Sequence, residues 1–244
     1  DLYRRPSEEV KQKFDKVEQQ LRTCLPAEMK DKPNWVIVRT RENADTGRLD
    51  KFLISPVTGK FAESDNPETW ADFDTACKYA RENGGVALAY ALDGKDGIAC
   101  IDLDHCVGED GKRSALADEV LSKCGKTYIE SSVSGKGIHV FGKTKGMDLR
   151  SFSKDGDMEF YQDSHFIAMT GDGAGYYNLE SFDTPEMKSL LERKLERRTE
   201  WKNVGKGMPG LTQWDDRELR EKAFSAKNGD TVKRLYNGED LRNN

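Results

Sequence analysis

The most informative stretch of the sequence is Gly97-Ile-Ala-Cys-Ile101, a short apolar run that continues directly into Asp102-Leu103-Asp104. Its brevity and its glycine boundary predict a buried strand and not a helix. Side chains two residues apart on a strand point the same way, so both carboxylates are expected on one face at the strand's C-terminal end. Two hard oxygen ligands held together suit Mg²⁺ or Mn²⁺, which take water and substrate phosphates as remaining ligands. The alternative is a polar strand end with two solvated acids.

Short strands and amphipathic helices surround this stretch. Strands are predicted at 35–38, 51–54, 86–92, 127–129, 138–141, 158–161 and 166–169, and helices at 7–24, 70–80 and 114–123. A polar turn is predicted at 41–50, and from Thr184 onward the pattern is charged and helical, with a second helical unit at 215–236. The fold class is therefore a mixed α/β (α+β) domain. We expect an N-terminal helix within 1–30, a core at 31–183, and a linker and the start of a helical domain at 184–244.

Composition excludes several classes of protein. The 244 residues carry a formal net charge of -5, and the longest apolar run, 86–92, is far shorter than the roughly 20 residues of a membrane span. The five cysteines contain no CxxC pair, so we expect neither a zinc cluster nor a disulfide framework, and we expect a cytoplasmic location. An acidic chain does not coat nucleic acid by bulk charge, although an enzyme can hold it in a local groove. Because the sequence begins at Asp1 without Met, we expect it to be a piece of a longer chain.

A glycine-rich segment between two predicted strands is the second candidate site. It reads Ser132-Val-Ser134-Gly135-Lys136-Gly137-Ile-His139. Glycines beside a lysine let backbone N–H groups approach a phosphate, while Lys136 and the Ser134 hydroxyl add a charge and a donor. From the start of the next strand, His139 can contact a triphosphate. The segment is not a Walker A loop, because no Ser or Thr follows the lysine, and a plain hairpin with a buried histidine is equally consistent with it.

Glu159 is the third candidate, a lone acid on a short apolar strand. It is either an exposed position of that strand or a third metal ligand. Two acids after a strand, a glycine-rich hairpin and a lone acid, in this order, match nucleotidyl transfer, in which metal ions neutralise phosphate charge.

The three motifs together resemble those of the archaeo-eukaryotic primase superfamily, in particular the primase-polymerases of phages and plasmids. They are a hydrophobic-DxD motif at 101–104, an SxH motif with interposed glycines at 132–139 and a hydrophobic-acid-hydrophobic strand at 158–160. The resemblance covers roughly residues 33–171. It implies that residues 31–183 form a catalytic core, in which an RRM-like sheet carries the acids and a smaller α/β unit closes a cleft.

The resemblance also implies the roles of single residues. Asp102, Asp104 and Glu159 are the implied catalytic residues and ligands of two divalent ions, Mg²⁺ or Mn²⁺. The implied nucleotide-binding residues are Ser134, Gly135, Lys136, Gly137 and His139. Lys51, His165 and Thr170 are accessory candidates, although many relatives have arginine where His165 stands.

The implied activity is that of a DNA-dependent primase-polymerase. Such an enzyme adds a nucleotide from a dNTP or NTP to a 3′-OH on a single-stranded DNA template, here in the replication of a phage or plasmid. A helicase domain or protein is an expected partner, and a membrane is not. Two alternatives stay open: a DxD-type nucleotide-sugar glycosyltransferase, which has no use for the glycine-rich hairpin, and a catalytically inactive origin-binding protein of the same fold.

The C-terminal part is locally basic. Residues 188–206 contain seven basic and three acidic residues, a local charge of +4 in a chain of -5. Residues 185–199 are either a solvated linker helix or part of a template-binding extension that starting a new strand requires. On the second hypothesis, truncation near Asp183 removes de novo primer synthesis and leaves primer extension largely intact.

Overall fold

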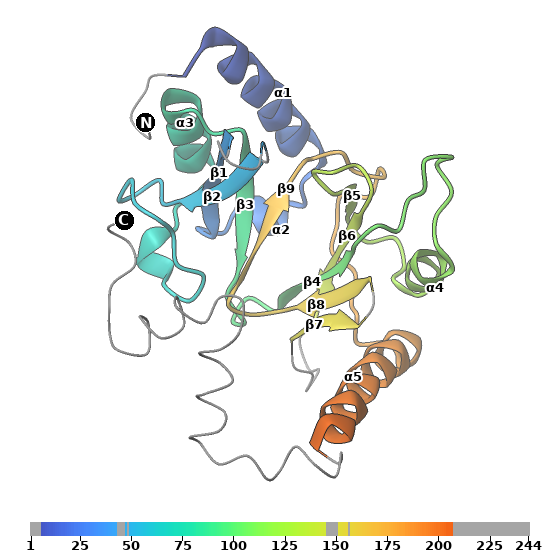
Figure 1. The fold of residues 1–244 in the computed structure, drawn as a ribbon. Coiled ribbons are helices and arrows are strands. Elements are labelled where there is room, and N and C mark those ends of the chain that lie inside the picture. Colours follow the sequence, from blue (N-terminus) through green and yellow to red (C-terminus); the bar gives the residue numbers. More distant parts are fainter. Residues whose placement is uncertain (1–5, 43–46, 48, 145–150, 156, 207–244) are drawn as a thin grey trace. The chain divides into compact units, whose positions relative to one another are not determined.

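The computed structural model describes residues 6–42, 47, 49–144, 151–155 and 157–206 (Figure 1). The chain divides into two compact units, residues 1–195 and 196–244, and the first unit holds both sheets of the described structure.

Helices separate groups of two to five consecutive strands along the chain. In order they are α1 (Glu8–Cys24), α2 (Ala27–Lys30), β1 (Trp35–Glu42), β2 (Leu49–Ile54), the 3-10 helix η1 (Pro67–Thr69), α3 (Phe73–Asn83), β3 (Ala87–Leu92), β4 (Ile98–Leu103), α4 (Ala115–Lys123), β5 (Ile129–Ser131), β6 (Ile138–Lys143), β7 (Phe152–Asp155), β8 (Met158–Tyr161), β9 (His165–Met169) and α5 (Pro185–Lys206). The strands form two antiparallel sheets, of order β2-β1-β3-β9 and β5-β6-β4-β8-β7. The predicted mixed α/β class is confirmed.

Several bounds differ from the predicted ones. Strands β1 and β2 extend into the predicted turn at 41–50, because Arg41 pairs with Asp50 across the hairpin. Strand β4 runs to Leu103, so Asp102 lies inside the strand and not after it. Strand β7 was not predicted. The predicted helical unit at 215–236 lies outside the described residues.

The helices begin at side chains that satisfy free backbone N–H groups. Ser7, Asp72 and Ser114 cap α1, α3 and α4, and each accepts a hydrogen bond from the N–H three residues on. Helix α3 ends at Gly84, whose φ of +74° is a left-handed conformation that glycine adopts without strain. Local sequence therefore determines where these helices start and stop.

Helices α1 and α3 lie on one face of the first sheet (Figure 1). Trp35 at the start of β1 is fully buried between Phe73 and Tyr90, with ring centroids 5.1 and 5.0 Å away. Phe14 and Leu21 of α1 complete this layer. Each such side chain contributes about 1.5–3 kcal/mol when buried, so this apolar layer fixes the N-terminal helix to the core.

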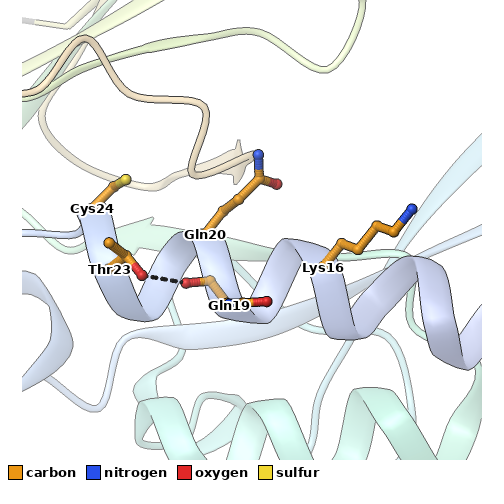
Figure 2. Close-up of a pocket in the computed structure, with 5 residues that line it drawn as sticks. All are labelled: Lys16, Gln19, Gln20, Thr23 and Cys24. Atoms are coloured by element: carbon orange, nitrogen blue, oxygen red, sulfur yellow. Dashed lines mark hydrogen bonds between the residues drawn. The ribbon is translucent and has the colours of Figure 1, made fainter.

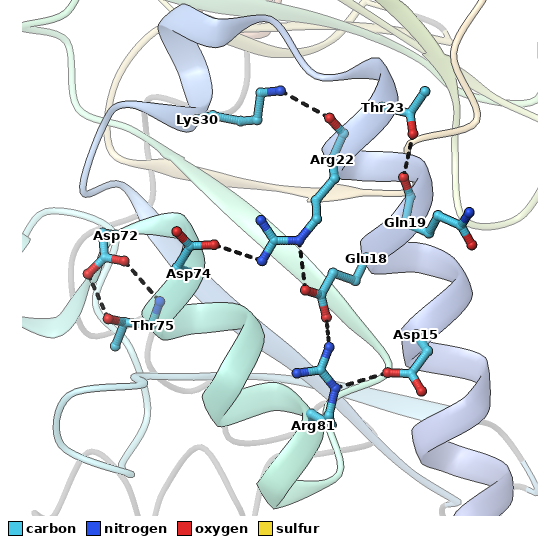
Figure 3. Close-up of polar contacts among 10 residues, drawn as sticks. All are labelled: Asp15, Glu18, Gln19, Arg22, Thr23, Lys30, Asp72, Asp74, Thr75 and Arg81. Carbon is cyan, nitrogen blue, oxygen red and sulfur yellow. Dashed lines mark hydrogen bonds and ion pairs between the residues drawn. The ribbon is translucent and has the colours of Figure 1, made fainter.

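A buried carboxylate joins α1 to α3 (Figure 3). The side chain of Glu18 is 8% exposed and accepts hydrogen bonds from Arg22, at 2.8 Å, and from Arg81. Arg22 also binds Asp74 at 2.7 Å, and Arg81 binds Asp15 at 2.9 Å. Because a buried charge is tolerated only when it is paired, this network fixes the orientation of α1 on α3.

The second sheet packs one face against α4 and the beginning of α5. Ile101 and Leu103 of β4 point to this side and contact a cluster that includes Met187, Leu190 and Leu191 of α5. The hypothesis of a solvated linker helix at 185–199 is therefore wrong for its first part. Met187, Leu190 and Leu191 form a buried apolar stripe at i, i+3 and i+4 among many charged residues, which is why the sequence pattern reads as a solvated helix.

All five cysteines are free thiols, and four of them are buried. Within the part of the chain that the structure describes, no helix combines the length and the apolar character that crossing a membrane requires.

Candidate active site

Four titratable side chains form a row across the second sheet. Asp102 on β4 lies opposite His139 on β6 and opposite Glu159 on β8, and His139 lies opposite Glu130 on β5. Directly opposite residues of antiparallel strands point to the same face, with Cβ atoms about 4.5–5.5 Å apart. The row occupies the face opposite α4 and α5, since Ile101 and Leu103 point to those helices. Residues of all three sequence motifs therefore meet on one surface.

Asp102 and Asp104 open into one cavity of about 320 Å³. Asp104 lies one residue beyond β4, where its N–H donates to the carbonyl oxygen of Asp157 at 2.8 Å. Both sheets contribute to the lining, which consists of Lys51, Asp102, Asp104, His105, Ser132, Val133, Ser134, His139, His165, Phe166, Ile167 and Ala168. The first sheet supplies Lys51 from β2 and 165–168 from β9.

The predicted nucleotide-binding residues divide into two groups. Ser134 and His139 line the cavity, as do the accessory candidates Lys51 and His165. Lys136 is exposed at the tip of the hairpin and is not among the lining residues. The hydroxyl of Thr170 donates to the carbonyl oxygen of Ser131 at 2.8 Å. Thr170 therefore links the segment after β9 to β5.

The hairpin approaches the end of β4 closely because of its glycines. A Cβ atom at Gly137 would lie 2.8 Å from the carbonyl oxygen of Leu103 and 2.8 Å from Ser132 Oγ. Gly135 has a φ of +69°, a left-handed conformation that disfavours other residues. The Ser132 hydroxyl accepts from the Gly137 N–H at 3.0 Å and is 3.0 Å from Ser134 Oγ. These contacts hold the hairpin beside Asp102 and Asp104.

Asp102 combines burial with an unsatisfied oxygen. Burial raises its pKa, the charges of Asp104 and Glu159 act in the same direction, and His139 and Lys51 oppose them. Its Oδ1 atom is buried without a hydrogen-bond partner among the described residues. An unsatisfied buried carboxylate oxygen is costly, and a hard divalent cation is one ligand that satisfies it. Asp102 and Asp104 thus fit a divalent ion.

The third predicted ligand is held differently. Glu159 accepts a hydrogen bond from the Tyr161 hydroxyl at 2.8 Å, and the Tyr161 ring stacks on His165 with centroids 3.6 Å apart. Across residues 6–206, as far as they are described, no three His, Cys, Asp or Glu side chains converge as a metal site.

His139 is buried beside two carboxylates. Its Nδ1 atom lies 3.1 Å from Glu130 Oε1, and its Nε2 atom lies 3.7 Å from Asp102 Oδ1. Burial lowers the pKa of His139, but the hydrogen bond to Glu130 and the charges of Glu130, Asp102 and Asp104 outweigh it, and the pKa is raised. This balance favours the imidazolium form, which suits a phosphate oxygen at the cavity.

Sequence analysis missed two members of the site, Glu130 and Tyr161. Glu130 precedes the glycine-rich motif by two residues, and Tyr161 follows Glu159 by two. Period-two alternation places Tyr161 on the face of Glu159, a signal that the sequence contains. The partnership of Glu130 with His139 depends on strand pairing, for which the sequence has no local signal.

A larger cavity, of about 430 Å³, lies along α1 (Figure 2). Its lining residues, Lys16, Gln19, Gln20, Thr23 and Cys24, all come from that helix. The Thr23 hydroxyl already donates to the carbonyl oxygen of Gln19 at 2.8 Å. No residue of the three motifs lines this cavity, so the cavity at Asp102 is the candidate active site.

Comparison with known proteins gives one informative similarity. No protein-family profile matches the chain. A curated relative named DNA primase-polymerase, from Nitratiruptor phage NrS-1, is 29% identical over 190 residues, which cover 76% of this chain and 25% of the relative. The chain thus spans about a quarter of the length of the curated relative it matches. This similarity confirms the resemblance of the chain to a phage primase-polymerase.

Proposed function

We propose that this chain is the catalytic region of a DNA primase-polymerase that replicates phage or plasmid DNA. It would transfer a nucleotide from a dNTP or NTP to a 3′-OH on a single-stranded DNA template. The observation that carries the proposal is the row of Asp102, His139 and Glu159 on adjacent strands. Asp102 and His139 of this row line one cavity together with Asp104, and Glu159 is not among its lining residues. The similarity to a phage protein named DNA primase-polymerase supports it.

Asp102 and Asp104 would hold the divalent ions, Mg²⁺ or Mn²⁺, with Glu159 as a further ligand. Such ions, when bound, neutralise phosphate charge and align the attacking and leaving oxygens. The Oδ1 atom of Asp102 supports this assignment, because it is buried without a hydrogen-bond partner among the described residues and the charges of His139 and Lys51 compensate its burial only in part. Tyr161 orients the carboxylate of Glu159 through its hydroxyl.

Ser134 and His139 would bind the triphosphate of the incoming nucleotide. Lys51 brings a positive charge to the same cavity from the opposite sheet. The backbone of Gly135 and Gly137 and the side chain of Lys136 would complete the phosphate contacts from the hairpin. A volume of about 320 Å³ is within the usual range of small-molecule sites, about 300–1,000 Å³.

The chemistry is a displacement at the α-phosphorus. The 3′-OH of the primer loses its proton to solvent and its oxygen forms a bond to this phosphorus, the bond to the bridging oxygen of the β-phosphate breaks, and pyrophosphate leaves. Asp102, Asp104 and Glu159 would hold the ions that neutralise charge at the reacting phosphate, while His139 and Lys51, which line the same cavity as the two aspartates, would supply positive charge to the leaving pyrophosphate.

The test is nucleotide incorporation on a single-stranded DNA template, with and without a primer, with Mg²⁺ or Mn²⁺ and separately labelled dNTPs and NTPs. We expect metal-dependent synthesis that Asp102→Asn or Asp104→Asn abolishes while DNA binding persists. The matched control is Asp110→Asn, an exposed acid paired with Lys112. Wild-type activity in either aspartate variant would contradict the assignment. Transfer from a nucleotide sugar would instead support a glycosyltransferase, and DNA binding without synthesis would support an origin-binding protein.

Nucleotide and template binding, measured separately, test the hairpin. His139→Ala and Lys136→Ala should weaken nucleotide binding more than binding of single-stranded DNA. The opposite result would place the hairpin on the template.

A further inference from the structure

Glu130 is a buried carboxylate next to the proposed nucleotide site. It lies on β5, is 1% exposed, and accepts hydrogen bonds from four groups. The donors are the Tyr128 hydroxyl at 2.8 Å, the Gly171 N–H at 3.0 Å, the Thr170 N–H at 3.2 Å and His139 Nδ1 at 3.1 Å. These donors lie just before β5, just after β9 and on β6, so the carboxylate joins three segments.

Three of these donors have fixed positions. Two are backbone N–H groups, and the third belongs to Tyr128, a side chain that is fully buried. Gly171 is fixed further, because its φ is +69° and a Cβ atom there would lie 2.7 Å from the backbone nitrogen of Leu21. The carboxylate of Glu130 is therefore held in one orientation by the fold itself.

This orientation determines that of the imidazole. His139 Nδ1 faces Glu130 Oε1, so Nε2 faces Asp102 and the cavity. A ring flip would remove one hydrogen bond from a buried carboxylate, which is energetically unfavourable. An N–H at Nε2 can then donate to an anionic ligand without a prior change of rotamer.

We infer that Glu130 is a positioning residue of the nucleotide site, which holds His139 through Nδ1 and thereby directs Nε2 at the triphosphate. The inference rests on the proposed function, because it takes the triphosphate as the ligand of His139. Thr170 and Gly171 contribute to the same positioning, because their backbone N–H groups fix the carboxylate that orients the histidine.

The first test is independent of catalysis. The chain has only three histidines, so ¹⁵N-histidine NMR with His139→Ala as the assignment control can identify the ring signals. We expect an exchange-protected Nδ1–H signal from His139 in the wild type. In Glu130→Gln the fixed donors retain the remaining carbonyl oxygen, the amide NH₂ faces His139, and this signal should disappear.

The matched control is Tyr128→Phe, which removes one donor to the same carboxylate without touching His139. It should retain the signal. The wild-type spectrum alone tests the geometry should Glu130→Gln fail to fold: absence of a protected Nδ1–H on His139 would overturn the inference. Persistence of the signal in a folded Glu130→Gln variant would overturn it as well.

The second test separates positioning from a merely structural role. In primer extension, Glu130→Gln should raise the nucleotide KM about tenfold, the loss typical of a weakened charge-assisted hydrogen bond, with little change in kcat. The double variant with His139→Ala should show no larger KM than His139→Ala alone, whereas independent roles give additive effects. Additivity would overturn the inference. If the wild type synthesises no DNA, the proposed function fails, while the NMR result still decides whether Glu130 positions His139.

Discussion

Replacing Asp102 by Asn should stabilise the metal-free protein while it removes synthesis. The Oδ1 atom of Asp102 is buried without a hydrogen bond among the described residues. Its burial and the charges of Asp104 and Glu159 outweigh the favourable charges of His139 and Lys51, so the pKa of Asp102 is raised and its ionised form is disfavoured. An amide of the same shape removes this repulsion, and its NH₂ group can donate to the neighbouring carboxylates. The same amide cannot supply the charge that a bound divalent ion requires.

The size of the effect follows from the burial of Asp102. A buried group without a hydrogen-bond partner costs about 1–3 kcal/mol. The Asp102 side chain is 20% exposed, so we expect the cost to lie at the lower end of this range, about 1 kcal/mol. For a domain of this size, that corresponds to a rise in Tm of about 2–4 °C.

The gain should depend on pH. Burial raises the pKa of Asp102 in the folded protein above the value of about 3.9 in an unfolded chain. Below that value the carboxyl is neutral in both states, and Asn offers no advantage. As the pH rises through the folded pKa, the wild type loses stability relative to the variant. The difference in Tm should therefore vanish in acid and be largest near neutral pH.

Thermal melting in EDTA, at pH 4 and pH 7, measures this difference, with Asp110→Asn as the exposed control. Added Mg²⁺ should raise the Tm of the wild type and have a smaller effect on Asp102→Asn, because a ligand stabilises only the state that binds it. An equal or lower Tm for Asp102→Asn at pH 7 in EDTA would show that the ionised carboxylate of Asp102 does not destabilise the metal-free protein, and would refute the prediction.

Three further predictions concern the surroundings of the site. Gly137→Ala places a methyl group 2.8 Å from the carbonyl oxygen of Leu103 and 2.8 Å from Ser132 Oγ, so we expect the free energy of unfolding to fall by about 1–3 kcal/mol. Denaturant titration measures this, and a variant as stable as the wild type would show that the hairpin can move away. Tyr161→Phe removes the hydrogen bond to Glu159, so half-maximal synthesis should require a higher Mg²⁺ concentration while the Tm stays the same. A titration of synthesis against Mg²⁺ measures this, and an unchanged midpoint would contradict the orienting role of Tyr161. Truncation at Asp183 should unfold the protein, because it removes buried α5 side chains. Truncation after Lys206 retains those side chains and the basic segment 188–206, so it should keep primer extension and the salt dependence of template binding. It should reduce de novo priming, because it removes the predicted helical unit at 215–236; equal loss of both activities in this folded fragment would contradict that expectation.

The sequence by itself determined the candidate residues of the site and most of the local structure. Alternation and apolar runs located eight of the nine strands that the structure describes, and apolar periodicity located α1, α3 and α4, although α3 begins at Phe73 and not at residue 70. The motifs named Asp102, Asp104 and His139 as candidates, and all three line one cavity. These predictions succeeded because they depend on local properties: side-chain periodicity and residue type.

Only the tertiary structure decided which of these groups meet. Period two says which face of a strand a residue occupies, but not which strand is its neighbour or in what register. The pairings of Asp102 with Glu159 and of Glu130 with His139, and the approach of Lys51 from the other sheet, are contacts between residues far apart in the chain. The position of the first part of α5 is a long-range property as well, because its apolar side chains pack against β4, which is distant in the sequence. Strand register and sheet packing are long-range properties, and they decide which of the motif residues lie side by side at the candidate site.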